Sequence, residues 1–243
     1  MRSGDAEPYF RFRLTPGFFA HLFKAVCKQH HLPLAPMLRR VIPEDGVVLD
    51  VGAHAGQFAK LFAKLAPKGF VYALEPGTYA RRILRVAIRA NGLRNVAILP
   101  FALGAQSGVA MLSIPVKASG SYGFGLSHIG APDRPGEREA VAMTTLDEAV
   151  DALGLTRLDF VKADIEGYEL QLVLGAQRTL ARLKPALLIE IDPGRLLRAG
   201  DSMEALWQAL VALGYRPVEP TPEQTPIASP RGGDVLWLPP LSR

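Results

Sequence analysis

The chain has 243 residues, of which 49% are hydrophobic and 21% are charged, and its formal net charge is +5. This composition is typical of a globular domain with a sizeable core, and it excludes fibrous and intrinsically disordered proteins. The apolar runs are far shorter than the roughly 20 residues that span a bilayer, the first residues show no signal-peptide pattern, and Cys27 is the single cysteine, so we expect a cytoplasmic protein without a transmembrane segment.

The first 45 residues predict a helical cap. Apolar side chains recur at helical spacing over residues 16–30, and a second short helix is expected over 37–42. Both helices would complete the core or border the entrance to a substrate site. We therefore divide the chain into an N-terminal cap, 1–45, and one larger domain, 46–243.

Strands and helices alternate along the larger domain. Short apolar runs predict strands over 47–51, 70–74, 96–99, 158–164, 186–191, 214–218 and 234–238. Amphipathic segments predict helices over 56–65, 79–91, 169–183 and 202–213. This alternation is typical of an α/β fold in which helices cover both faces of a mostly parallel sheet.

Basic residues are concentrated in the first 100 positions, which hold 15 lysines and arginines against 6 acids. The most prominent group, Arg81, Arg82, Arg85 and Arg89, falls on one predicted helix, opposite its apolar residues. That pattern is typical of the solvated face of an amphipathic helix. We therefore do not expect nucleic acid as a partner.

A glycine-containing turn follows the first predicted strand, in the segment Asp50-Val-Gly-Ala-His-Ala-Gly56. A nicotinamide site would carry G-x-G-x-x-G, in which a helix N-terminus receives a pyrophosphate. Here the middle glycine is missing and an acid is present, which favours a zwitterionic ligand such as S-adenosylmethionine over a dinucleotide. Glu75 ends the second strand, where a carboxylate can accept hydrogen bonds from ribose hydroxyls. The candidate cofactor residues in these two segments are Asp50, Gly52, Ala53, His54, Gly56, Glu75 and Pro76.

Acidic residues cluster where two later strands end. Asp164 and Glu166 follow one strand, and Glu190 ends the strand predicted beside it. We predict that Asp164 and Glu166 are catalytic, either by accepting a proton from a substrate hydroxyl or by holding Mg²⁺ together with Glu190, which also borders the substrate. Nearby Glu169 and Asp192 are expected to cap helices, because acids favour helix N-termini.

Residues 115–139 are rich in glycine and proline and show no regular pattern. A stretch of this length is typical of a lid or a binding loop. We expect this loop to close over a substrate, with Tyr122 and His128 lining the acceptor pocket.

These motifs resemble the FkbM family of S-adenosylmethionine-dependent methyltransferases. The resemblance runs from about residue 47 to 192 and rests on Leu49-Asp-Val-Gly-Ala-His-Ala-Gly56, Ala73-Leu-Glu-Pro76, Pro100-Phe-Ala-Leu-Gly104, Thr144-Thr-Leu-Asp147, Phe160-Val-Lys-Ala-Asp-Ile-Glu-Gly-Tyr-Glu169 and Leu187-Leu-Ile-Glu190. It implies a Rossmann-like class I methyltransferase fold with seven strands, the last one antiparallel. It also implies methyl transfer to a hydroxyl of a sugar or secondary metabolite, and it puts Ala102 and Leu103 near the adenine.

Other interpretations stay open at this stage. An RNA methyltransferase would share the cofactor site and differ in its acceptor, and a non-catalytic module would bind the cofactor without turnover. The apolar helix within 16–30 is also compatible with a homo-oligomer. The partner that we expect is a small-molecule or glycan hydroxyl compound.

Overall fold

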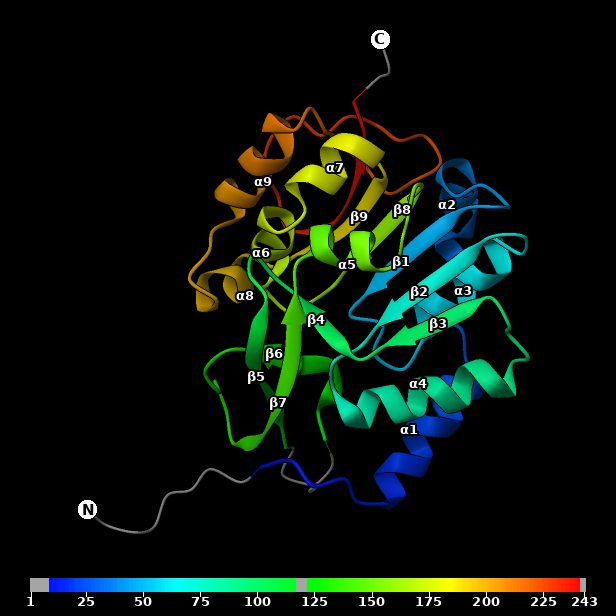
Figure 1. Cartoon of the computed structure of the whole chain (residues 1–243), viewed down its shortest axis with the longest axis vertical. Helices are drawn as coiled ribbons and strands as arrows, with labels where there is room; N and C mark the ends of the chain where they lie inside the picture. The colour runs from blue at the N-terminus through cyan, green and yellow to red at the C-terminus, as the bar shows by residue number, and fades with distance from the viewer. Residues whose placement is uncertain (1–8, 117–121, 241–243) are drawn as a thin grey trace.

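The computed structural model describes residues 9–116 and 122–240, which form a seven-stranded main sheet and a four-stranded second sheet (Figure 1). The main sheet contains β1 (Val47–Val51), β2 (Phe70–Leu74), β3 (Val96–Leu99), β8 (Phe160–Ala163), β9 (Ala186–Ile191), β10 (Arg216–Val218) and β11 (Gly233–Leu238). The second sheet contains β4 (Phe101–Leu103), β5 (Gly108–Pro115), β6 (His128–Ile129) and β7 (Gly136–Thr144). The helices are α1 (Pro16–Cys27), α2 (Ala35–Val41), α3 (Gln57–Leu65), α4 (Thr78–Ala90), α5 (Leu146–Ala152), α6 (Glu169–Leu174), α7 (Gln177–Leu183), α8 (Pro193–Arg198) and α9 (Met203–Ala212), with short 3₁₀ turns at Leu32–Leu34 and Phe124–Leu126.

The main sheet has the strand order β10-β11-β9-β8-β1-β2-β3. The pairs from β9 to β3 are parallel, whereas β11 runs antiparallel to both β9 and β10. The predicted α/β fold, with seven mostly parallel strands and an antiparallel last strand, is therefore confirmed. Because β1 and β8 are neighbours, the glycine turn after β1 and the acids after β8 lie at the same edge of the sheet.

Helices cover both faces of the main sheet because its strands are apolar on both sides. Leu49 and Val51 of β1 pack in one core with α5, α6, α7 and α9. The alternate residue Val48 points to the opposite face and packs with α2 and α3. Each of the helices described in residues 9–116 and 122–240 is too short or too polar to cross a membrane.

The second sheet is the part of the fold that the sequence did not predict. β5 pairs antiparallel with β7 from Gly108 opposite Met143 to Pro115 opposite Gly136, and β6 pairs with β5. Regular structure therefore occupies part of the 115–139 segment, so the expectation of a patternless loop is wrong for β6 and for the start of β7. The remainder of that segment includes residues 117–121, which lie outside the described residues.

The N-terminal helix α1 packs against α4 and the second sheet (Figure 1). Phe18 on α1 meets Tyr79 on α4 edge to face, with ring centroids 5.6 Å apart. At the other end of α1, the buried ammonium of Lys60 donates to the carbonyl oxygens of Ala25 and Lys28. Both contacts hold α1 beside the edge of the main sheet that carries the predicted site.

The single helix predicted over 169–183 is wrong, because α6 and α7 are separate helices. Gly175 lies between them against the backbone of Gly104, and a Cβ at this position would overlap the Gly104 carbonyl oxygen. A new helix begins directly afterwards, since the Asp147 carboxylate accepts the backbone N–H groups of Arg178 and Thr179 at 3.1 and 2.7 Å.

Candidate functional site

The glycine turn after β1 needs glycine for its own packing. Gly52 and Gly56 have φ values of +76° and +87°, in the region that favours glycine. A Cβ on Gly52 would overlap the carbonyl oxygen of Asp164, and a Cβ on Gly56 would lie 2.5 Å from Leu84. The Gly52 turn and the backbone of Asp164 are therefore in direct contact.

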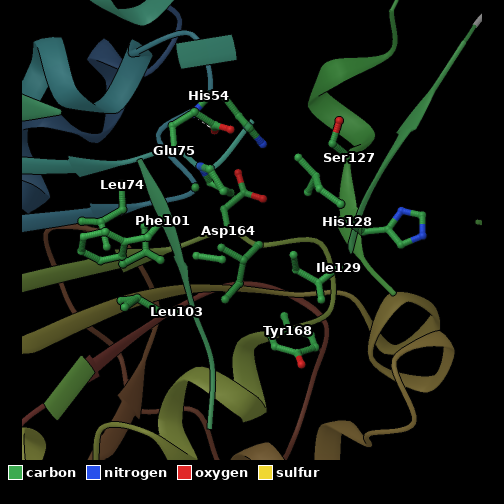
Figure 2. Close-up of a pocket in the computed structure, with 16 residues that line it drawn as sticks. His54, Leu74, Glu75, Phe101, Leu103, Ser127, His128, Ile129, Asp164 and Tyr168 are labelled. Carbon is green, nitrogen blue, oxygen red and sulfur yellow. Dashed lines mark hydrogen bonds between the residues drawn. The ribbon is translucent and has the colours of Figure 1, made fainter. Parts of the chain in front are cut away.

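Two adjoining cavities open at this edge of the sheet. The first, which we call the Glu75 cavity, has a volume of about 50 Å³ and is lined by Val51, Gly52, His54, Leu74, Glu75, Pro76, Phe101, Ala102, Leu103, Leu112, Ser127, His128, Ile129, Asp164, Ile165 and Tyr168 (Figure 2). The second, which we call the α1 cavity, measures about 380 Å³ and lies between α1, the glycine turn and residues 122–126. Gly52, His54 and Asp164 line both cavities.

Glu75 is held by backbone donors at the tip of β2. Its Oε2 accepts the His54 N–H at 2.9 Å and its Oε1 accepts the Gly77 N–H at 2.8 Å. Each oxygen keeps further acceptor capacity. Burial raises the pKa of Glu75 to about 7, although the two backbone N–H groups oppose that shift. Further hydrogen-bond donors from a ligand would therefore stabilise the ionised carboxylate of Glu75.

Asp50 lies beneath the glycine turn and lines neither cavity. It is fully buried, and among the described residues neither of its carboxylate oxygens has a hydrogen-bond partner. Burial raises the pKa of Asp50 to about 6, and the charge of Lys162 acts in the opposite direction. Lys162 occupies the paired position on the neighbouring strand β8.

Lys162 and Asp164 form an ion pair between the two cavities. Lys162 Nζ lies 3.1 Å from Asp164 Oδ2, and only 5% of the lysine side chain is exposed. Burial favours the neutral amine, yet Asp164 and Asp50 raise the pKa of Lys162. Burial likewise favours the neutral form of Asp164, but Lys162 and His54 lower the pKa of that carboxyl. Both groups are therefore charged near neutral pH.

Glu190 lies close enough to Asp164 for the two carboxyls to affect each other's pKa. The hydrogen bond to Asp164, together with burial, raises the pKa of Glu190 to about 8. Arg195 also approaches Glu190, with Nη1 3.3 Å from Oε2.

Glu166, predicted to be catalytic, lines neither cavity. Its carboxylate is buried against Arg195, with Oε2 3.0 Å from Nε, and its backbone has a φ of +60°. Arg198 donates to its carbonyl oxygen at 2.7 Å. The structure therefore does not bring Glu166 and Asp164 together as two acids facing one cavity, because the turn directs Glu166 towards α8.

The acids do not form the magnesium site that we considered. Lys162 pairs with Asp164, and Arg195 pairs with both Glu166 and Glu190. Within residues 9–116 and 122–240, no three His, Cys, Asp or Glu side chains are grouped as ligands for a metal ion. Asp192 caps α8 as predicted, whereas the Glu169 carboxylate accepts from Ile165 and Gly167 and thereby orders the turn before α6.

Tyr122 and His128 belong to different cavities. Tyr122 lines the α1 cavity, and its hydroxyl donates to Glu137 at 2.9 Å. His128 borders the Glu75 cavity, but its imidazole points away from Asp164 (Figure 2) and its Nε2 lies 3.0 Å from the carbonyl oxygen of Ala131. The structure therefore separates the two residues that we expected in one acceptor pocket.

Several residues of the α1 cavity were not predicted from the sequence. One is Lys162, although a lysine inside an otherwise apolar strand can indicate a functional site. His31 is another, with its ring stacked on Phe58 at a centroid distance of 3.9 Å. Burial, and then the charge of Lys162, lower the pKa of His31. His54 likewise has a lowered pKa, caused first by burial.

Comparisons with known proteins bear on this arrangement. A family model described as the methyltransferase FkbM domain matches residues 50–217. AmbE, the AMB antimetabolite synthetase of Pseudomonas aeruginosa, is 25% identical over 210 residues, which cover 72% of this chain and 10% of AmbE. The chain thus spans only a small part of that relative.

Two solved structures share the fold. Methyltransferase FkbM from Methylobacillus flagellatus has a TM-score of 0.53 at 16% identity, covering 92% of this chain and 58% of its own. A Streptococcus mutans protein in complex with S-adenosylhomocysteine has a TM-score of 0.51 at 11% identity, covering 84% of this chain and 94% of its own. The architecture is that of the class I methyltransferases.

Proposed function

Because the chain belongs to the FkbM family of methyltransferases, we propose that it transfers a methyl group from S-adenosylmethionine to a hydroxyl oxygen of a sugar or secondary metabolite. The observation that carries the proposal is the position of Asp164, an ionised carboxylate that lines both cavities. The donor would occupy the Glu75 cavity, which would have to widen from its volume of about 50 Å³, and the acceptor would occupy the α1 cavity.

The Glu75 cavity suits the donor in its chemistry. Glu75 offers unused acceptor capacity to ribose hydroxyls, and Phe101, Ala102 and Leu103 supply an apolar wall for a purine. Asp50 adds negative charge below the glycine turn, which favours a cationic ligand. Bound S-adenosylmethionine supplies a methyl group activated by its sulfonium charge, and transfer breaks a C–S bond and forms a C–O bond.

Asp164 would orient the acceptor hydroxyl by accepting its hydrogen bond. A carboxylate with a lowered pKa is a weak base towards a free alcohol. The hydroxyl proton becomes far more acidic as the new C–O bond forms, and Asp164 can then accept it and pass it to solvent. Lys162 holds the carboxylate in place, and such alignment of reactants lowers the barrier by several kcal/mol.

The relative AmbE supports a secondary-metabolite acceptor, because its name describes a synthetase of an antimetabolite. That support is limited to the acceptor class, since this chain corresponds to 10% of AmbE. The basic residues on α4 do not extend into either cavity, and this favours a small acceptor over an RNA.

The variant Asp164→Asn tests the assignment. We expect turnover to fall by about 10²- to 10⁴-fold, the usual contribution of a positioned acid or base, while the Kd for S-adenosylhomocysteine changes less than about threefold. Labelled methyl transfer to a panel of sugars and hydroxylated metabolites measures the first quantity, and calorimetry measures the second. The matched control is Asp151→Asn, an exposed acid paired with Arg178. Normal turnover of Asp164→Asn, or no binding of S-adenosylhomocysteine to the native protein, would contradict the proposal.

A further inference from the structure

The α1 cavity collects most of the histidines of the chain. Four of the five histidines line it, together with two lysines. These residues are His21, His30, His31, His54, Lys24 and Lys162. Asp164 is the acid among its lining residues, and Lys162 already neutralises that carboxylate. With neutral histidines, the lining thus keeps one net positive charge, which belongs to Lys24.

Lys24 is exposed on α1 and faces this cavity without a counter-ion. Within the described residues no ion pair involves its ammonium group, whereas Lys162 is held 3.1 Å from Asp164. His30 is also exposed, and His31 is fixed by its stack on Phe58. Among the described residues, the cavity therefore presents the Lys24 ammonium without an ion-pair partner, together with the imidazoles of His30 and His31.

Three charged groups of the cavity act on His31. After burial, the charges of Lys162 and His30 lower the pKa of His31, whereas Asp164 raises it. Groups that repel protons in this way attract anions, and they do so more strongly inside a cavity than in bulk water.

We propose that the methyl acceptor carries an oxyanion, a phosphate or a carboxylate, which Lys24, His30 and His31 bind while the acceptor hydroxyl lies at Asp164. This inference rests on the proposed function and narrows its acceptor class to anionic hydroxyl compounds. A hydrogen bond between charged groups is about twice as strong as a neutral one, so these side chains can select such an acceptor.

The position of these residues along the chain favours the acceptor over the donor as the source of the oxyanion. The family model matches residues 50–217, and His21, Lys24, His30 and His31 all precede it. The donor is common to the family, so its binding groups belong in the shared domain. Residues outside that domain can differ between family members according to the acceptor that each member binds.

The affinity of the α1 cavity for an oxyanion should depend on pH. The charged and titratable groups that line the cavity are His21 and Lys24 on α1, His30 and His31 after it, His54 on the glycine turn, Tyr122, and Lys162 and Asp164 at the end of β8. A bound oxyanion stabilises the protonated form of His31, so binding takes up a proton. Affinity should therefore strengthen as the pH falls from 8 to 6.

Titration with sulfate and with acetate tests the inference, because neither probe changes its charge between pH 6 and 8. Binding is followed by NMR of the histidine ring signals, in protein saturated with S-adenosylhomocysteine. We expect at least one probe to bind, with preference for sulfate indicating a phosphate and preference for acetate indicating a carboxylate. Lys24→Gln and His31→Gln should each weaken binding roughly tenfold. The control Lys28→Gln removes the same charge from an exposed lysine that does not line the cavity, and it should leave binding unchanged.

Three results would overturn the inference. The first is that neither probe binds the protein, with or without S-adenosylhomocysteine. The second is that a probe binds the free protein but not the saturated protein, which would assign the oxyanion site to the donor. The third is that Lys28→Gln weakens binding as much as Lys24→Gln, which would indicate a nonspecific charge effect. Failure of the proposed function is a separate result. In that case S-adenosylhomocysteine does not bind, while sulfate or acetate still binds the free protein and depends on Lys24.

Discussion

The buried acids near β8 and β9 take different protonation states because their neighbours differ. Asp164 lies beside Lys162 and stays ionised, whereas Glu190 shares its hydrogen bond and has a pKa of about 8. Glu166 is buried, and burial raises its pKa to about 7 despite the contact with Arg195. The pKa values of Asp164 and Glu190 are therefore shifted in opposite directions. Such pairs are a common way for a site to hold an acid and a base at one pH.

Glu75→Gln should weaken the binding of S-adenosylhomocysteine by about 10- to 100-fold. In the native protein each carboxylate oxygen accepts a hydrogen bond from a backbone N–H, one from His54 and one from Gly77. In the variant one of these oxygens is replaced by an NH₂ group, which cannot accept that hydrogen bond. Loss of a hydrogen bond to a charged group costs about 1.5–3 kcal/mol. Calorimetry at pH 8 measures the change.

The native protein provides the pH control for Glu75. Its affinity for S-adenosylhomocysteine should fall as the pH drops below about 7, where the carboxylate becomes protonated, and this dependence should be reduced in Glu75→Gln. Equal affinity of the variant and the native protein at pH 8 would remove Glu75 from the proposed donor site.

Single residues were only partly predictable from the sequence. The positions of Asp164 and Glu75 follow from the rule that ligands bind at the carboxyl ends of parallel strands. The direction of Glu166 does not, because it depends on a left-handed backbone conformation and on a tertiary contact with Arg195. The role of Lys162 was missed because Asp50 and Asp164, which stabilise its buried positive charge, are brought beside it only by the tertiary structure.

At the scale of elements, local pattern predicted the main sheet and missed the second one. The strands of the main sheet are short apolar runs, and such runs are readable without knowledge of their partners. β5 and β7 are longer and mix polar and apolar residues. They are stabilised by pairing with each other, and such pairing between distant segments cannot be recognised from a short stretch of sequence. The break between α6 and α7 likewise depends on the distant backbone of Gly104.

Gly175→Ala should destabilise the protein by about 1–3 kcal/mol, because the added methyl group would overlap the carbonyl oxygen of Gly104. The φ of Gly175 is −84°, so backbone strain does not contribute to this cost. Urea unfolding measures the difference. Gly108→Ala is the matched control, since a Cβ there meets nothing within 4 Å. If both variants had the same free energy of unfolding, the close packing of Gly175 would not explain the helix break.

At the scale of the whole molecule, buried acids make the stability of the ligand-free protein depend on pH. Burial raises the pKa values of Glu75 and Glu166 to about 7, well above those in the unfolded chain. The folded state therefore binds more protons than the unfolded state, and stability decreases as the pH rises through this range. The lowered pKa values of His31 and His54 act in the opposite direction, but only up to about pH 6.5.

The free energy of unfolding should therefore fall between pH 6.5 and 8.0. Glu75 and Glu166 together contribute roughly 1–2 kcal/mol to this decrease. Urea unfolding at the two pH values measures it, and Glu166→Gln should reduce the difference. A free energy of unfolding that is constant or higher at pH 8.0 would contradict the assignment of raised pKa values to these carboxyls.

The wall that the two cavities share has a consequence for how the protein can diversify. Gly52, His54 and Asp164 line both cavities, so under the proposed function a change in the size of any of these residues would affect both binding sites. Residues such as Lys24 and His30 line one cavity and can change under a single constraint. If the two cavities bind donor and acceptor as proposed, related proteins can therefore change their acceptor through α1 and the residues after it without altering the donor site.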